Sequence, residues 1–238
     1  MTPVLILTRP APQAEAFATQ IAARWAGPVQ VILSPLLRIA PVPVIADLSQ
    51  VTGVIFTSAH GVAAAQYTNL ARGLPAWCVG DKTAQLAADA GFDAIAGPGD
   101  AIRLVEKIMS RRPQGPMAHL RGNHTRGGVA EKLISAGIAC IDVVAYDQLA
   151  QSLSDDALDA LHGAAPVILP LFSPRTATIL AEQGPFTAAV QLIVISTAVQ
   201  TAAAAMRVKS VSVAATPDAE AMIVATLKRL GAAAERMA

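Results

Sequence analysis

Hydroxyl-bearing, basic and glycine residues follow several short apolar runs of the sequence, and these residue types can bind anions. The segments that contain them are Thr8-Arg9, Thr57-Ser58, Gly80 to Thr83, Arg121-Gly122, Phe172-Ser173 and Ser196-Thr197. Serine and threonine hydroxyls, together with backbone N–H groups at helix starts, suit carboxylates and other anions. For any single hydroxyl, an N-cap that only begins a helix is the more common role. Six such positions together favour an anion-binding site.

Other kinds of catalytic site have little support in the sequence. Ser58 and His60 are two residues apart, but no orienting acid is identifiable and no Gly-x-Ser-x-Gly turn occurs. The histidines and cysteines lack metal-ligand spacing, and Cys78 and Cys140 are expected to be buried apolar residues without a disulfide. Glycine motifs for phosphate or dinucleotide binding are missing, and segment 122–128 is expected to be a loop. The sequence therefore predicts neither a metal nor a cofactor.

The spacing of the apolar runs indicates the elements that must position these residues. Runs of four to seven residues alternate with helical patterns along the chain, which is typical of parallel strands with crossover helices. Ligands of such sheets bind beyond the carboxyl ends of the strands. The uncharged segment 186–206 is interrupted by polar residues, so a buried strand and an Ala-rich helix are expected there rather than a membrane span. The predicted class is α/β.

The pattern occurs twice, which indicates an internal duplication. Four pairs of strand-end positions match: Arg9 with Arg121, Ser58 with Ser173, Gly80 with Ser196, and the turn at 97–100 with the turn at 216–220. The first three offsets are 112, 115 and 116 residues. A period of this length predicts two homologous α/β halves rather than a solenoid, whose repeats are much shorter.

Two extended segments lie outside the duplication and are expected to connect the halves. Segment 33–44 contains prolines at positions 35, 41 and 43, which disfavour a helix, and segment 140–149 is an apolar stretch. Residues 1–36 together with 150–238 are expected to form one discontinuous domain. Residues 37–149 are expected to form the second, inserted domain.

Composition restricts the possible partners. The 238 residues carry a net charge of only +1, and charged residues make up 15% of the chain. Such a balance argues against nucleic-acid binding by counterion release. The N-terminal segment has no basic n-region, so it is expected to be a first strand of a cytoplasmic protein rather than a signal peptide. A monomer is expected, because no heptad pattern is present.

Several short motifs, in this order and spacing, resemble those of the uroporphyrinogen-III synthase family. They are Leu7-Thr8-Arg9-Pro10, Ile55-Phe56-Thr57-Ser58-Ala59-His60-Gly61-Val62, Val79-Gly80-Asp81-Lys82-Thr83-Ala84, Leu120-Arg121-Gly122, Val144-Ala145-Tyr146 and Phe172-Ser173-Pro174-Arg175-Thr176-Ala177. Each motif is weak by itself. Together they cover nearly the whole chain and are specific.

The resemblance implies two flavodoxin-like domains joined by a pair of extended strands, with linear hydroxymethylbilane bound in the cleft between them. It implies cofactor-independent ring closure with inversion of ring D, and a proton donor at Tyr146, where a buried structural tyrosine is the alternative. The implied substrate-binding residues are Thr8, Arg9, Thr57, Ser58, Ala59, His60, Gly80, Lys82, Thr83, Arg121, Ser173, Ser196 and Thr197. Arg9 could also only brace its loop.

Two departures from the family pattern concern the implied contacts. His60 stands where many members have asparagine, and Val199 where some have a threonine. A non-catalytic two-domain binding module is the alternative function, and an enzyme acting on phosphate esters is a second one. Missing acidic metal ligands and a missing P-loop weigh against the latter.

Overall fold

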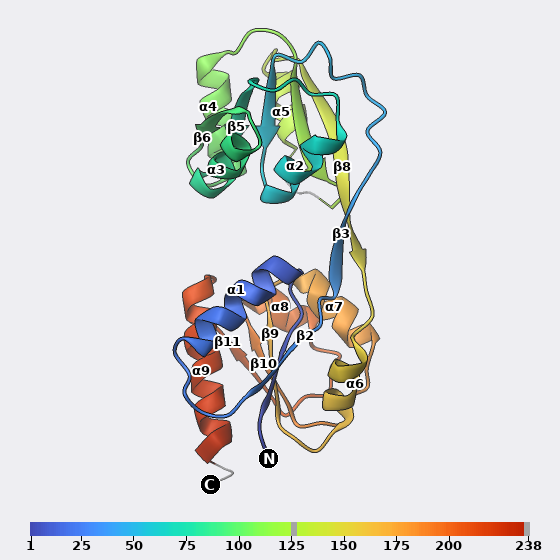
Figure 1. The fold of residues 1–238 in the computed structure, drawn as a ribbon, viewed down its shortest axis with the longest axis vertical. Coiled ribbons are helices and arrows are strands. Elements are labelled where there is room, and N and C mark those ends of the chain that lie inside the picture. Colours follow the sequence, from blue (N-terminus) through green and yellow to red (C-terminus); the bar gives the residue numbers. More distant parts are fainter. Residues whose placement is uncertain (125–127, 236–238) are drawn as a thin grey trace. The chain divides into compact units, whose positions relative to one another are not determined.

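A computed structural model describes residues 1–124 and 128–235 of the protein (Figure 1). The middle of the loop expected at 122–128 lies outside the described residues. The chain divides into two compact units. Unit 1 comprises Met1–Arg38 and Ala150–Ala238, and unit 2 comprises Ile39–Leu149.

Unit 1 contains a five-stranded parallel sheet, sheet A, in the order β11-β10-β9-β1-β2. Its strands are β1 (Val4–Leu7), β2 (Gln30–Leu33), β9 (Val167–Leu171), β10 (Val190–Val194) and β11 (Ser210–Val213). Every residue of β1, β9 and β10 is buried, because these strands are central and helices cover both faces of the sheet.

Five helices pack on sheet A in two layers. The helices α1 (Ala11–Ala22) and α9 (Ala219–Glu235) form one apolar core with the residues Leu5, Ile168 and Ile193 of the sheet. The opposite face is covered by α6 (Asp155–His162), α7 (Pro174–Glu182) and α8 (Thr197–Ala202). The uncharged segment 186–206 thus forms β10 and α8, as expected from the sequence.

Unit 2 contains a six-stranded sheet, sheet B, in the order β3-β8-β7-β4-β5-β6. Its strands are β3 (Leu37–Pro41), β4 (Gly53–Phe56), β5 (Pro75–Cys78), β6 (Asp93–Ala96), β7 (Met117–Gly122) and β8 (Cys140–Ala150). The five strands from β8 to β6 pair in parallel. On one face lie α2 (Ala59–Ala64), the short 3-10 helix η1 (Ala65–Tyr67) and α3 (Asp81–Asp89), and on the other lie α4 (Ala101–Arg111) and α5 (Val129–Ser135).

The two sheets have matching strand orders. Sheet A reads β2-β1-β9-β10-β11 and sheet B, without β3, reads β8-β7-β4-β5-β6. Each strand that leads to one of the matched sequence positions therefore has the same place in its sheet as its counterpart in the other sheet. The order in sheet A is the 2-1-3-4-5 order of flavodoxin-like folds. The expected α/β class with duplicated parallel sheets is confirmed. Within the described residues, no helix is long and apolar enough to cross a membrane.

Candidate functional site at the strand ends

The predicted site residues of unit 2 lie where its parallel strands end. Thr57 and Ser58 directly follow β4, and Gly80 lies two residues beyond the end of β5. Arg121 is the penultimate residue of β7, and Tyr146 lies in β8. Because β8, β7, β4 and β5 are consecutive parallel neighbours, these residues come to the carboxyl edge of one sheet, where ligands bind in doubly wound folds.

Ser58 and Tyr146 form a hydroxyl pair at this edge. Ser58 is the N-cap of α2, and its Oγ accepts a hydrogen bond from the Gly61 N–H at 3.2 Å. The Tyr146 hydroxyl lies 2.9 Å from the same Oγ, close enough for a hydrogen bond in either direction. Tyr146 is only 6% exposed, whereas Ser58 is half-buried. Ser58 is therefore the more accessible hydroxyl of the pair.

A β-bulge turns Tyr146 toward Ser58. The register between β7 and β8 shifts after Arg121, which pairs with Val144, so that Gly122 pairs with Tyr146. The shift places Ala145 and Tyr146 in the same core, beneath α2 and α3. A Cβ on Gly122 would lie 2.6 Å from ring atom Cε2 of Tyr146, so the ring can lie here only beside a glycine.

The His60 side chain packs against the Tyr146 ring. Its imidazole lies 5.6 Å from the Tyr146 ring centroid, tilted by 60°. Burial lowers the pKa of His60, which favours the neutral imidazole at neutral pH. Ser58 Oγ is bonded to Gly61 and Tyr146, and no hydrogen bond to His60 occurs among the residues that the structure describes. This geometry gives no support to a Ser58–His60 catalytic pair.

Thr57 begins a chain of polar side chains on the other face of sheet B. Its Oγ1 lies 3.2 Å from His119 Nε2, and His119 Nδ1 lies 3.5 Å from Asp142 Oδ1. His119 is 1% exposed, and burial lowers its pKa to about 4. A neutral His119 with its proton on Nδ1, facing the carboxylate, would accept a hydrogen bond from the Thr57 hydroxyl at Nε2. Thr57 would then offer oxygen lone pairs to a ligand.

Arg121, predicted to bind a substrate carboxylate, already holds a carboxylate of the protein. Its Nε lies 2.8 Å from Asp142 Oδ1, and its Nη2 lies 2.6 Å from Asp142 Oδ2. The hydrogen bond from Arg121 is the main reason that the pKa of Asp142 is lowered. A substrate carboxylate at Arg121 would have to compete with this bidentate pair.

The turn after β5 offers backbone donors rather than a charged cluster. Gly80 is the N-cap of α3 and has an extended conformation. A Cβ added to Gly80 would have Gly99 as its nearest neighbour, at 3.6 Å, so the surroundings of Gly80 are open. Lys82 is exposed on the first turn of α3, whereas Thr83 is only 7% exposed. The N–H groups that begin a helix carry partial positive charge, which favours anions.

In unit 1, Thr8 and Arg9 follow β1. Thr8 is 1% exposed, and its Oγ1 is buried with no hydrogen-bond partner among the described residues. The Arg9 guanidinium stacks over the Phe172 ring, 4.1 Å from its centroid. Burial lowers the pKa of Arg9, but an arginine stays charged at neutral pH. The stacking fixes the guanidinium in place, which is compatible with both roles expected for Arg9.

Ser173 and Ser196 differ in what their hydroxyls do. Ser173 is the N-cap of α7, and its Oγ accepts from the Thr176 N–H at 3.1 Å and lies 2.8 Å from Thr176 Oγ1. Ser196 is the N-cap residue of α8 but makes no side-chain capping bond, and the following Thr197 is exposed. The Ser196 hydroxyl is therefore not used to cap its helix, unlike that of Ser173. Val199 is buried in the core.

Two residues of the polar chain, His119 and Asp142, were not predicted from the sequence. A signal was present, since His119 interrupts the apolar run of β7 two residues before Arg121 and so lies on the same strand face. Asp142 pairs with His119 across the sheet, and this pairing depends on strand order. Among residues 1–124 and 128–235, no group of three or more His, Cys, Asp or Glu could hold a metal ion. Cys78 and Cys140 are both free, and Cys78 is buried as expected, whereas Cys140, at the start of the β8 strand, is only partly buried and differs from the expectation.

The fold and the strand-end residues define a two-unit α/β protein with hydroxyl and backbone donors at the carboxyl edges of its two sheets. The family model described as "Uroporphyrinogen-III synthase HemD" matches residues 16–224, which is most of the chain. The protein belongs to the uroporphyrinogen-III synthase (HemD) family.

A solved structure shows the same fold at low sequence identity. The structure of uroporphyrinogen-III synthetase from Helicobacter pylori is 17% identical, with a TM-score of 0.66 over 96% of this chain and 100% of that chain. A mutant uroporphyrinogen III synthase from Thermus thermophilus is 16% identical, with a TM-score of 0.49 over 98% of this chain and 99% of that chain. Comparison with curated proteins gives no match.

Proposed function

We propose that this protein is a uroporphyrinogen-III synthase, which converts hydroxymethylbilane to uroporphyrinogen III with loss of water and inversion of ring D in tetrapyrrole biosynthesis. The observation that carries the proposal is the family match over residues 16–224, because this range includes most of both units. We take these two units as the two domains expected from the sequence. The reaction needs no cofactor.

The strand-end groups suit a substrate with many carboxylates. Backbone N–H groups and hydroxyls at helix starts can hold acetate and propionate groups without a cluster of lysines. This mode of binding is compatible with the net charge of +1. In unit 2 we assign substrate contacts to Thr57–His60, Gly80, Lys82, Thr83 and Arg121. In unit 1 we assign them to Thr8, Arg9, Ser173, Ser196 and Thr197.

The chemistry requires a proton for the leaving hydroxyl and control of which carbon attacks. Protonation and loss of the terminal hydroxyl release water, and loss of the pyrrole N–H proton leaves an azafulvene. The substituted carbon of ring D then attacks the azafulvene to give a spiro intermediate, which breaks and recloses with ring D inverted. Without an enzyme the free end of ring D attacks and gives the non-inverted isomer. Positioning of the substrate is therefore the main catalytic task.

We assign the proton donor to the Ser58–Tyr146 pair. In this assignment the accessible Ser58 hydroxyl protonates the leaving group while Tyr146 passes its own proton to Ser58 Oγ along their 2.9 Å contact. The pyrrole N–H proton released in azafulvene formation restores the pair, so the protons balance. The positive end of the first turn of α2 would stabilise the transient negative charge.

A coupled assay tests the function. Hydroxymethylbilane is generated in the presence of the protein, the products are oxidised, and the type I and type III uroporphyrins are separated by chromatography. Predominantly type III product is expected. Type I alone, from protein shown by circular dichroism to be folded, would exclude the synthase and favour a non-catalytic binding module.

A further inference from the structure

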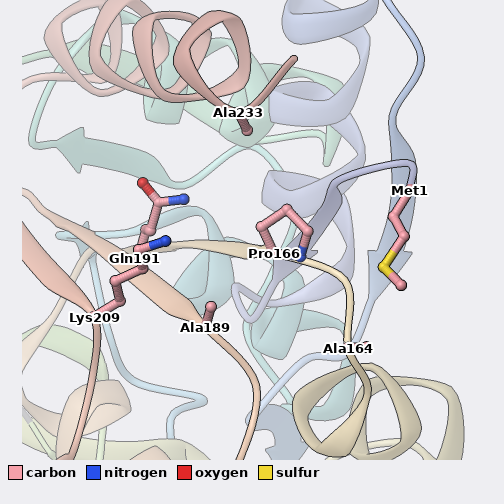
Figure 2. A pocket seen from close by; sticks show the side chains of 7 residues that line it. All are labelled: Met1, Ala164, Pro166, Ala189, Gln191, Lys209 and Ala233. Atoms are coloured by element: carbon pink, nitrogen blue, oxygen red, sulfur yellow. The ribbon is translucent and has the colours of Figure 1, made fainter. Parts of the chain in front are cut away.

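A cavity of about 270 Å³ lies at the other edge of sheet A, where its strands begin (Figure 2). The residues Ala164, Pro166, Ala189 and Ala233 contribute apolar walls, and Gln191 and Lys209 contribute the polar groups. Pro166, Ala189 and Lys209 each directly precede β9, β10 or β11. The cavity is therefore at the edge opposite to Thr8, Ser173 and Ser196, and the proposed synthase function makes no use of it.

Gln191 is an unusual residue in this position. It is the only polar residue of β10, whose other four residues are apolar, and it is 5% exposed. Its register partner Ile168 belongs to the core beneath α1 and α9, so the Gln191 side chain lies on that face of the sheet. Figure 2 shows its carboxamide extending from the strand into the cavity on the side of Ala233.

No hydrogen bond joins the Gln191 carboxamide to another group in the part of the chain that the structure describes, and its N and O atoms are not fully buried, so they can reach a molecule in the cavity. A carboxamide in the wall of a cavity can orient a bound molecule by donating or accepting a hydrogen bond. Ser210, the register partner of Gln191 on β11, has a buried Oγ that also lacks a partner in the described chain. Two unused polar groups thus lie side by side on the same face of the sheet.

Lys209 supplies a positive charge at the same cavity. It is exposed and directly precedes Ser210, and Figure 2 shows its side chain beside that of Gln191. An ammonium group with a carboxamide donor at one side and alanine and proline walls at the other matches a molecule with an anionic head and an apolar body. The volume is below the range of about 300–1,000 Å³ of sites for drug-sized ligands.

We propose that this cavity binds a small monocarboxylic acid. The carboxylate accepts hydrogen bonds from Lys209 Nζ and from the Gln191 carboxamide N–H, and the apolar body packs against Pro166 and Ala189. The ligand would join β9, β10 and β11 to the end of α9, so its binding stabilises unit 1.

Titration with benzoate, followed by ¹H–¹⁵N NMR and thermal unfolding of the full chain, tests the proposal. Benzoate is expected to shift the amide signals of residues 189–191 and 209–210 and to raise the unfolding temperature. Benzyl alcohol, which has a similar shape without the charge, is expected to bind at least about tenfold more weakly. No tetrapyrrole is needed, so the result is independent of the synthase assay.

Three variants distinguish this site from an ordinary surface. Gln191→Leu should weaken benzoate binding at least about tenfold, and Lys209→Gln about three- to fivefold. Lys228→Gln on α9 is the matched control, since Lys228 is exposed in the same unit but does not line the cavity. The Lys228→Gln protein should bind benzoate with the affinity of the wild type. If Gln191→Leu does not fold, the benzoate affinities of Lys209→Gln and Lys228→Gln still show whether benzoate binds at this cavity.

The proposal is overturned if wild-type protein binds no benzoate, which would identify a cavity filled by water. It is also overturned if benzyl alcohol binds as tightly as benzoate, or if Lys209→Gln and Lys228→Gln have the same affinity.

Discussion

The hydroxyls of Ser58 and Tyr146 lie 2.9 Å apart although 88 residues separate them in the sequence. The contact depends on the order β8-β7-β4 in sheet B and on the bulge opposite Gly122. Because Ser58 also caps α2, the pair connects the start of a helix with a strand two places away. Changes at the two residues should therefore not be additive.

Tyr146→Phe should lower the rate of uroporphyrinogen III formation about tenfold without abolishing it. The substitution keeps the ring beside Gly122, and Ser58 keeps a hydroxyl that can donate a proton, while positioning supplies most of the catalysis. The coupled isomer assay measures the rate. In a Ser58→Ala background the same change should have a smaller effect. Complete loss of activity in a folded Tyr146→Phe protein would contradict this view.

Ser58→Ala and Ser196→Ala should separate structural from ligand-binding hydroxyls. Loss of the Ser58 cap and of its contact with Tyr146 should lower the free energy of unfolding by about 1–2 kcal/mol. Ser196 makes no side-chain cap, so Ser196→Ala should leave the free energy of unfolding within about 0.5 kcal/mol and raise KM. Urea unfolding and steady-state kinetics measure these quantities. An unchanged KM for Ser196→Ala would remove Ser196 from the binding residues.

His119 should make the protein less stable as the pH falls from about 6.5 to about 4. In this window the unfolded chain binds a proton at His119, whose ordinary pKa is about 6.5, while the folded protein, with a pKa of about 4, does not. Stability therefore rises with pH there, by up to about 1.4 kcal/mol per pH unit and about 3 kcal/mol in total.

Comparison with His119→Gln isolates this contribution, because His60 also has a lowered pKa and contributes in the same direction. Urea unfolding at several pH values between 4 and 7 gives the difference in free energy of unfolding between the two proteins. A difference that does not change with pH would show that His119 has the same pKa in the folded and the unfolded chain, which would contradict the prediction.

Thr83→Val should raise KM several-fold with little change in stability, since valine has nearly the same shape and Thr83 is 7% exposed. Thr226→Val is a matched control. Thr226 is a fully buried threonine of unit 1 whose hydroxyl donates to the Met222 carbonyl within α9. Its kinetics should equal those of the wild type. Kinetics of Thr83→Val equal to the wild type would remove Thr83 from the site.

The sequence by itself determined the fold class, the duplication and the strand-end positions. Strands covered on both faces appear as continuous apolar runs, as in β1 and β9, and such runs are local features of the sequence. The matched spacing of Arg9 with Arg121 and of Ser58 with Ser173 predicted equivalent elements, and the sheet orders agree with it.

The tertiary structure alone decided which of these residues meet. Alternation along β8 would place Tyr146 on the face of Asp142 and Val144, but the bulge turns it to the face of α2. The approach of His119 to Asp142, and hence the engagement of Arg121, depends on the register between β7 and β8. Strand order and register result from packing between segments distant in the sequence, so no local pattern specifies them.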